Sequence, residues 1–199
     1  PMHGRNFEYF GEHPFLAAHT VVQYIEGLQS QGVCATVKHF MGNNSEFDRH
    51  NTNSIIDERT MREIYLPTFE AAVKKANVCS IMDSYNLVNG LHMTQNGYLN
   101  TDVVKKEWGY PGIIMSDWGG TYDGVGEVNG GLDLEMPSGA VMNRANLLPA
   151  VKAGKGSEAT IDDHVLFRRR RDVEYGWLEP GYDQTELSIS RYNEEGREV

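Results

Sequence analysis

Polar side chains that can do chemistry fall at three places along the chain, each directly after a short apolar run. They are Lys38-His39 after residues 33–37, Asp83 to Asn86 after residues 78–82, and Ser116-Asp117-Trp118 after residues 113–115. Short β-branched runs are typical of buried parallel strands, and the carboxyl ends of such strands meet at one edge of a sheet. We therefore expect the three clusters to converge where barrels and open α/β sheets carry their active sites.

Asp117 is the candidate nucleophile of this site. A carboxylate at a strand end, beside an indole and two glycines, suits attack on the anomeric carbon of a sugar. The ring of Trp118 can stack on the apolar face of a sugar, and Gly119 and Gly120 let the chain approach closely. The alternative is that Asp117 only caps a helix or lies in a loop.

The neighbouring clusters supply suitable partners. Lys38 and His39 can both donate hydrogen bonds to sugar hydroxyls, and the charge of Lys38 favours the ionised form of a nearby carboxylate. Tyr85 can orient a carboxylate by hydrogen bonding, whereas Met82 is more typical of core packing. An alternative is that the polar residues at these strand ends have no functional role.

Arg49 lies in the long polar loop after Lys38-His39 and is either a second sugar ligand or a salt-bridge partner of Asp48. The same region offers donors for a zinc or calcium site, namely His39, His50, Asp48 and Glu46. No His-Glu-x-x-His, Cys-x-x-Cys or EF-hand spacing occurs, so a metal-dependent hydrolase is the weaker hypothesis. No phosphate-binding or dinucleotide-binding glycine loop is recognised either, and we expect no cofactor.

The charge and the cysteines narrow the function further. A net charge of -10 disfavours binding to nucleic acid or to anionic membranes, and it suits a neutral substrate such as a sugar. The basic run 168–171 has acidic neighbours and is expected to be a solvated or salt-bridged face. No apolar run approaches the length of a membrane helix. Cys34 and Cys79 are expected to be buried free thiols rather than a disulfide or a metal pair.

The elements that must position these residues alternate along the chain. Helices are expected over 14–31, 57–76 with Asp57 as the N-cap, 100–108, 143–153 and 158–175, and strands over 33–37, 78–82, 113–115 and 132–136. This alternation predicts a parallel α/β fold. The 199 residues are too few for a complete (β/α)8 TIM barrel of about 250 residues.

Six ordered motifs resemble the β-glucosidases of glycoside hydrolase family 3 and span nearly the whole chain. They are GRNFEYFGE at 4–12, KHF at 38–40, DERTMREIYLP at 57–67, MDSYN at 82–86, EWGY at 107–110 and SDW at 116–118. The resemblance implies that residues 1–175 are the later part of a TIM-barrel catalytic domain. Residues 176–199 would be a linker toward a second α/β domain. The sequence after Phe40 differs from that of the family's β-N-acetylglucosaminidases, which favours the glucosidase branch.

The resemblance also implies a reaction and a substrate. A retaining exo-β-glycosidase of this type hydrolyses terminal β-D-glucosyl residues of β-glucosides or cello-oligosaccharides by double displacement. Asp117 would be the nucleophile. The residues implied to bind the sugar are Arg5, Lys38, His39, Arg49, Met82, Tyr85 and Trp118.

Several departures bear on activity. His13 stands where the family usually has Asp. The resemblance places the first barrel strands before residue 1, and the general acid, a Glu of the second domain, after residue 199. Without that acid a poor leaving group is expelled inefficiently, so an inactive carbohydrate-binding fragment is the alternative. A partial barrel also has free strand edges, and we expect marginal stability or oligomerisation.

Overall fold

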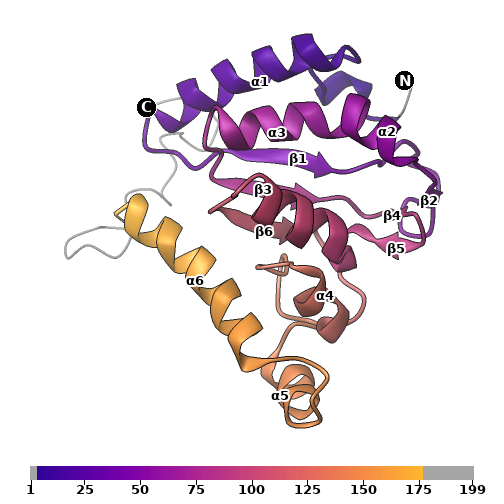
Figure 1. Ribbon diagram of the computed structural model, residues 1–199, viewed down its shortest axis with the longest axis vertical. Helices are drawn as coiled ribbons and strands as arrows, with labels where there is room; N and C mark the ends of the chain where they lie inside the picture. The colour runs from indigo at the N-terminus through magenta and orange to yellow at the C-terminus, as the bar shows by residue number, and fades with distance from the viewer. Residues whose placement is uncertain (1–3, 177–199) are drawn as a thin grey trace, which may run out of the picture.

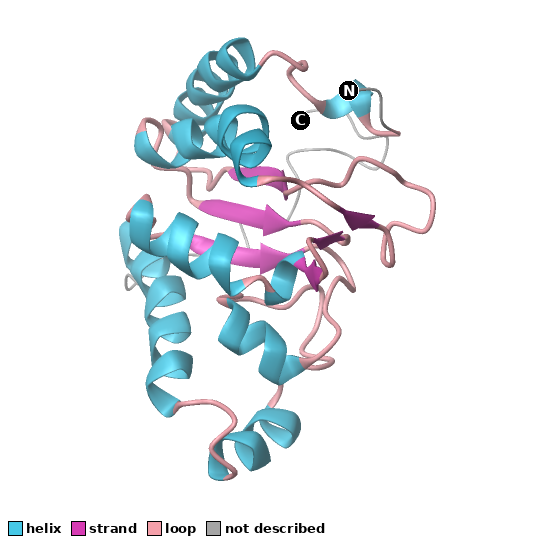
Figure 2. Cartoon of the chain, turned by 45° about the vertical axis from the view of Figure 1, so that its right-hand side comes forward, coloured by secondary structure: helices cyan, strands magenta, loops and turns pink. Residues whose placement is uncertain are grey.

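The structure is a computed structural model that describes residues 4–176, with a parallel sheet at its centre (Figures 1 and 2). The sheet has the order β1-β3-β6, with β1 (Thr36–Phe40), β3 (Ser80–Asp83) and β6 (Ile113–Ser116). A smaller sheet joins β2 (Asn53–Ser54), β4 (Leu87–Val88) and β5 (Leu91–His92). Helices separate the three central strands in sequence, so the predicted parallel α/β arrangement is confirmed. The expected linker lies outside the described residues.

The helices gather at the two sides of this sheet. They are α1 (Pro14–Gln29), α2 (Glu58–Thr60), α3 (Leu66–Lys74), α4 (Gly124–Gly130), α5 (Arg144–Lys152) and α6 (Glu158–Glu174), with 3-10 turns η1 (Asn6–Glu8) and η3 (Met93–Gln95) and π-helical segments η2 (Met61–Tyr65) and η4 (Tyr98–Glu107). Helices α1 and α3 pack together beside β1, whereas α4, α5 and α6 lie beyond β6 (Figure 1). Among the described helices, none is both long and apolar enough to span a membrane.

The strand register brings the carboxyl ends of the three strands to one level. Phe40 pairs with Asp83, and Asp83 pairs with Ser116, directly before Asp117. One pair earlier, Lys38 lies beside Met82. The alternate positions, such as Ile81 and Ile114, are fully buried in the core. The sheet therefore holds the polar clusters at one edge, as the sequence predicted.

Two strand predictions are corrected by the structure. Strand β1 begins at Thr36, which pairs with Ser80, so Lys38 and His39 lie inside the strand near its end rather than after it. Residues 132–136 form no strand, and only a single bridge joins Leu134 to Met115. Here the carboxylate of Asp133 accepts the N–H of Ile114 (2.9 Å), so a side chain takes the place of a main-chain ladder partner.

Local residues explain where the helices begin and break. Asp57 caps α2 as predicted, since its Oδ1 accepts the N–H of Thr60 (3.0 Å). The single helix expected over 57–76 changes to a π-helical turn before Pro67, which has no N–H to donate to the preceding turn. His13 is the N-cap of α1 and makes no side-chain cap bond. Helix α4 was not predicted because its sequence is rich in glycine; it is capped by Asp123, whose Oδ1 accepts the N–H of Val125.

The prediction of two free thiols is wrong, because Cys34 and Cys79 form a disulfide. Cys79 immediately precedes β3 and Cys34 lies two residues before β1, and the starts of these neighbouring strands are paired, with Thr36 opposite Ser80. Their Cα atoms are 5.3 Å apart, which lies within the range that a disulfide spans. This proximity depends on the strand order, which the spacing of the two cysteines does not reveal.

A buried cluster of charged side chains fastens η4 and α6 to the sheet. The side chain of Asp133 is fully buried, and its Oδ1 lies 2.6 Å from Lys105 Nζ and 2.5 Å from His164 Nδ1. Nearby, Arg171 is 1% exposed and donates to the carbonyl of Val78 (3.3 Å). Arg171 is therefore buried rather than solvated, unlike the exposed face expected for the run 168–171.

We expect Lys105→Met to lower the free energy of unfolding by roughly 3–5 kcal/mol, because it leaves the buried carboxylate of Asp133 without its cation. Urea denaturation measures this change. Lys106→Met is the matched control, since Lys106 pairs with Asp102 on the surface (2.8 Å) and should change stability by less than about 1 kcal/mol. Equal effects of the two substitutions would contradict a structural role for the buried pair.

We expect Cys34→Ala to lower the free energy of unfolding by about 2–4 kcal/mol, because the disulfide closes a loop with a sequence separation of 45. Urea denaturation of the oxidised chain gives the value. In the unsubstituted chain a reducing agent should cause a similar loss, whereas Cys34→Ala should not respond to it. A Cys34→Ala variant as stable as the oxidised chain would contradict this role.

Candidate active site

Asp117 lies at the carboxyl end of β6, and its side chain is held at both oxygens. Its Oδ1 accepts the N–H of Trp118 (2.6 Å), and its Oδ2 lies 3.4 Å from Nε2 of His39. Tyr85, at the end of β3, donates its hydroxyl hydrogen to the carbonyl of Trp118 (3.0 Å), the residue after Asp117. Asp117 is 9% exposed, so few orientations are open to it. The structure thus brings the residues after β6 and β3 together with His39 of β1, as the sequence predicted.

His39 is a buried, neutral imidazole. Its Nδ1 lies 3.2 Å from the hydroxyl of Tyr9, and it is 4% exposed. Burial, followed by the positive charges of Lys38 and Arg5, lowers its pKa to about 4 against the opposing effect of Asp117. A tautomer with hydrogen on Nε2 satisfies both neighbours, because the Tyr9 hydroxyl donates to Nδ1 and the Nε2–H faces Asp117.

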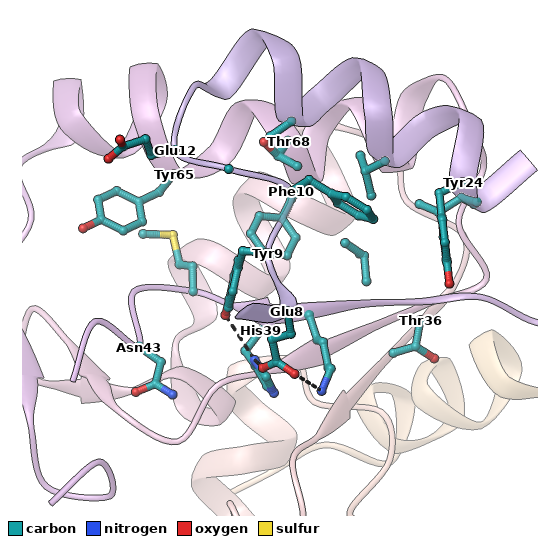
Figure 3. Close-up of a pocket in the computed structure, with 18 of the residues that line it drawn as sticks. Glu8, Tyr9, Phe10, Glu12, Tyr24, Thr36, His39, Asn43, Tyr65 and Thr68 are labelled. Carbon is teal, nitrogen blue, oxygen red and sulfur yellow. Dashed lines mark hydrogen bonds and ion pairs between the residues drawn. The ribbon is translucent and has the colours of Figure 1, made fainter. Parts of the chain in front are cut away.

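Glu8, which lies beside His39 in Figure 3, connects the positively charged residues of the site. Its carboxylate accepts hydrogen bonds from Nε and, at 3.2 Å, Nη2 of Arg5, and lies 3.5 Å from Nζ of Lys38. The hydrogen bond from Arg5, followed by the charge of Lys38, holds the pKa of Glu8 below its usual value. Sequence reasoning did not select Glu8 or Tyr9; the spacing of Glu8, three residues after Arg5, is the one signal that pointed to it.

Arg49 lies across the ring of Tyr85. Its guanidinium carbon is 4.3 Å from the ring centre, and its Nη1 is 2.8 Å from Oε2 of Glu46. The suggested salt bridge to Asp48 is therefore wrong, since Asp48 accepts a hydrogen bond from Asn51 instead (2.8 Å). Burial and then the charge of Asp117 raise the pKa of Tyr85 to about 12, so its phenol keeps its proton.

Met82 and Trp118 lie at the margins of the same site. Met82 is half-buried beside Lys38 in the strand register. Trp118 is 63% exposed, while its carbonyl accepts a hydrogen bond from the hydroxyl of Tyr85 (3.0 Å). Its indole is therefore free of the core and can stack on the apolar face of a ligand.

The residues suggested as metal donors do not converge. His50 Nδ1 lies 2.9 Å from the hydroxyl of Tyr122, Glu46 pairs with Arg49, and His39 faces Asp117. Between residues 4 and 176 no group of three or more His, Cys, Asp or Glu side chains is placed to hold a metal ion. The arrangement of these donors does not support a metal-dependent hydrolase.

A groove of about 630 Å³ runs beside β1 toward α1 and α3 (Figure 3). Its apolar walls include Val21, Tyr24 and Phe69, and its polar end includes Lys38 and His39. Asp117 does not line this groove. His39 lines the groove and also faces Asp117, so the carboxylate lies outside this groove.

We expect His39 to make stability depend on pH between its ordinary pKa of 6.5 and its native value of about 4. In this window the unfolded chain binds a proton that the native chain does not, so the free energy of unfolding falls as pH falls. The contribution is about 3 kcal/mol in total and is constant above pH 6.5. Urea denaturation from pH 7 to pH 4 tests this, with His39→Asn as the comparison. Identical pH profiles for the two proteins would contradict the buried neutral imidazole.

Comparison with known proteins identifies the family. Residues 1–168 match the glycosyl hydrolase family 3 N-terminal domain. A β-glucosidase of Rhizobium radiobacter is 49% identical over 160 residues, which are 80% of this chain and 20% of that protein. An exo-α-(1→6)-L-arabinopyranosidase of Bifidobacterium breve is 46% identical over 81% of this chain and 21% of that protein.

Solved structures agree with these relatives. A structure of β-glucosidase 3B from Thermotoga neapolitana in complex with glucose has a TM-score of 0.83 and 37% identity, over 94% of this chain and 28% of that one. A β-glucosidase of Bifidobacterium adolescentis has a TM-score of 0.83 and 39% identity over 93% of this chain and 28% of its own. The chain spans about a fifth of the length of the curated relatives it matches. It belongs to glycosyl hydrolase family 3, and its three-stranded parallel sheet is part of that family's barrel domain.

Proposed function

We propose that this chain supplies the nucleophile and part of the sugar-binding subsite of a retaining β-glucosidase. One observation carries the proposal: the carboxylate of Asp117 is fixed by Trp118 N–H at one oxygen and faces His39 Nε2 at the other. A fixed carboxylate among hydrogen-bond donors suits attack on an anomeric carbon. The same geometry without chemistry would describe a carbohydrate-binding fragment, which is the second candidate.

In the first step, an oxygen of Asp117 attacks the anomeric carbon, and the bond to the leaving oxygen breaks with its electron pair. A glycosyl ester on Asp117 results, and water then hydrolyses it with net retention of configuration. Lys38 is placed to donate hydrogen bonds to sugar hydroxyls, together with the nearby guanidinium of Arg5, while the single N–H of His39 is directed at Asp117. Tyr85 keeps its proton and donates it to the carbonyl of Trp118, next to the nucleophile.

The general acid is proposed to come from outside this chain. Two further carboxylates lie at the site, Glu8 and Glu46, and each is paired with an arginine. A general acid needs a raised pKa so that it still carries a proton near neutral pH. The pKa of Glu8 is lowered instead, and Glu46 is bound to the guanidinium of Arg49 (2.8 Å). Both are better suited to holding arginines than to giving up protons.

The proposed substrate is a terminal β-D-glucosyl residue of a β-glucoside or a cello-oligosaccharide. The β-glucosidase from T. neapolitana in complex with glucose supports this choice. The arabinopyranosidase relatives point to a second sugar, L-arabinopyranose, on a similar scaffold. Hydrogen-bond donors at the site can bind either sugar, so the choice of glucose over arabinopyranose is part of the proposal.

We expect an activated 2-deoxy-2-fluoro-β-glucoside to form a covalent adduct on Asp117. Its good leaving group departs without acid assistance, and the 2-fluoro substituent slows hydrolysis of the glycosyl-enzyme, so the ester accumulates. Intact-mass spectrometry followed by peptide mapping detects one added fluoroglucosyl group on the peptide that contains Asp117.

Asp117→Ala should abolish this labelling, and the matched variant Asp102→Ala should not, because Asp102 lies in a surface pair with Lys106. Glucose binding without an adduct, on a folded sample, would favour the non-catalytic carbohydrate-binding fragment. A 2-fluoro-arabinopyranoside that labels faster than the glucoside would overturn the proposed substrate while keeping the nucleophile.

A further inference from the structure

Glu135 is a buried carboxylate near residues 117–121, the segment that begins with the proposed nucleophile. Most of the hydrogen bonds to its oxygens come from main-chain N–H groups. It is 7% exposed. Its Oε1 accepts the hydroxyl hydrogen of Thr121 (2.9 Å) and the N–H groups of Ala140 (2.9 Å) and Val141 (3.1 Å). Its Oε2 accepts from Val141 again (3.1 Å) and from Met142 (2.6 Å). Nothing in the proposed reaction uses this buried acid.

The chain around Glu135 runs alongside the residues that carry the nucleophile. The N–H of Ser116 donates to the carbonyl of Leu134 (2.9 Å), and the N–H of Met136 donates to the hydroxyl of Ser116 (2.8 Å). Beyond Asp117, the N–H of Gly119 donates to the carbonyl of Met136 (2.9 Å). Residues 134–136 are thus hydrogen-bonded along the length of residues 116–121.

Residues 140–142, whose N–H groups donate to Glu135, are themselves held in place. The carbonyl of Val141 accepts from Nδ2 of Asn146 (3.0 Å), at the start of α5. A Cβ added to Gly124, the first residue of α4, would lie 2.2 Å from that carbonyl, so α4 and residue 141 are in close contact. Helices α4 and α5 lie together beyond β6 (Figure 1). Glu135 therefore joins the nucleophile segment to a fixed part of the molecule.

We propose that Glu135 is a positioning residue that fixes the nucleophile segment, residues 117–121, for attack by Asp117. The inference rests on the proposed function of Asp117. The middle of the segment is tied by Tyr85, whose hydroxyl donates to Trp118, and by Thr94, whose hydroxyl donates to the carbonyl of Gly120 (3.1 Å). Its far end is tied through Thr121 to Glu135. Gly119 and Gly120 lie between Trp118 and Thr121. Without the contact from Thr121 to Glu135, these glycines leave the far end of the segment free to shift.

A carboxylate is required at position 135, and an amide does not replace it. Every contact at Glu135 comes from a donor, so both oxygens must accept. In Glu135→Gln one oxygen becomes an NH₂ group, and in either orientation its hydrogens oppose main-chain N–H groups. The substitution removes the clamp with almost no change in side-chain volume.

The test compares the labelling kinetics of Glu135→Gln with those of the unsubstituted chain, using the activated 2-fluoro-glucoside. We expect the maximal labelling rate to fall roughly 10- to 100-fold, because a displacement of about 1 Å at the attacking atom costs that much. The dissociation constant of the glucoside should change far less, by no more than a few-fold, since Arg5 and Lys38 lie on other elements and Trp118 is the one sugar-stacking residue within the segment. A general loss of folding would raise this constant as well as slow the labelling. Glu70→Gln is the control, since Glu70 pairs with Lys74 on the surface of α3 (2.6 Å).

Hydrogen exchange gives a second measurement that does not depend on activity. We expect the amides of Gly119 and Gly120 to exchange faster in Glu135→Gln, while those of α3 keep their protection. If Glu135→Gln does not fold, Thr121→Val removes the hydroxyl contact alone and should slow labelling several-fold at an unchanged dissociation constant.

The outcomes distinguish the positioning role of Glu135 from the proposed function of Asp117. Normal labelling and exchange in Glu135→Gln, with an adduct on Asp117, would overturn the positioning role and leave the proposed function intact. No adduct in the unsubstituted folded chain would overturn the proposed function and, with it, the role of Glu135 in attack. Slow labelling with a weakened dissociation constant would also overturn the positioning role, because it indicates damage to the whole site.

Discussion

The site depends on the parallel register of β1, β3 and β6. A shift of one residue in a strand moves every side chain to the opposite face of a sheet. Such a shift in β1 would exchange the places of Lys38 and His39, and it would remove the imidazole from Asp117. The register is held at one end by the disulfide between Cys34 and Cys79. Beside β6 it is held by Asp133, which accepts the N–H of Ile114 and is itself paired with the buried Lys105. Residues far from Asp117 therefore determine which side chains face it.

The electrostatics of the site follow from where this register places charge. Burial keeps His39 neutral, and the charges of Lys38 and Arg5 strengthen that effect. In the proposed reaction this matters, because the sugar gains positive charge at the anomeric carbon as the leaving group departs. A protonated imidazole next to Asp117 would repel that charge and weaken the nucleophile. A neutral imidazole directs an N–H toward Asp117 without this repulsion. The burial of His39, which keeps the ring neutral, therefore suits the proposed reaction.

The sequence predicted those features that depend on local pattern and on general properties of parallel sheets. Apolar runs followed by Lys38-His39 and by Asp117 were enough to predict that these residues meet, because parallel strands end at one edge. Predictions failed where the partner lies far away in sequence. Cys34 was expected to be a free thiol because its pairing with Cys79 depends on strand order, and Asp48, the alternative partner suggested for Arg49, is replaced by Glu46. Residues 132–136 form only a single bridge to β6, where the side chain of Asp133 accepts the N–H of Ile114, a contact that no periodicity reveals.

In the proposed function, the charge at the site also bears on whether a charged or an uncharged sugar is bound. The whole chain carries a net charge of -10, yet Arg5, Lys38 and Arg49 gather around Asp117. Glu8 neutralises the first two in part, and Glu46 pairs with Arg49. Unpaired, these cations would attract a uronic acid or a phosphorylated sugar as strongly as a neutral one. Paired, they keep their hydrogen-bond donors while most of their charge is neutralised, which suits the uncharged sugar of the proposed function. The same pairing holds the pKa of Glu8 below its usual value, so Glu8 is unsuited to be the general acid.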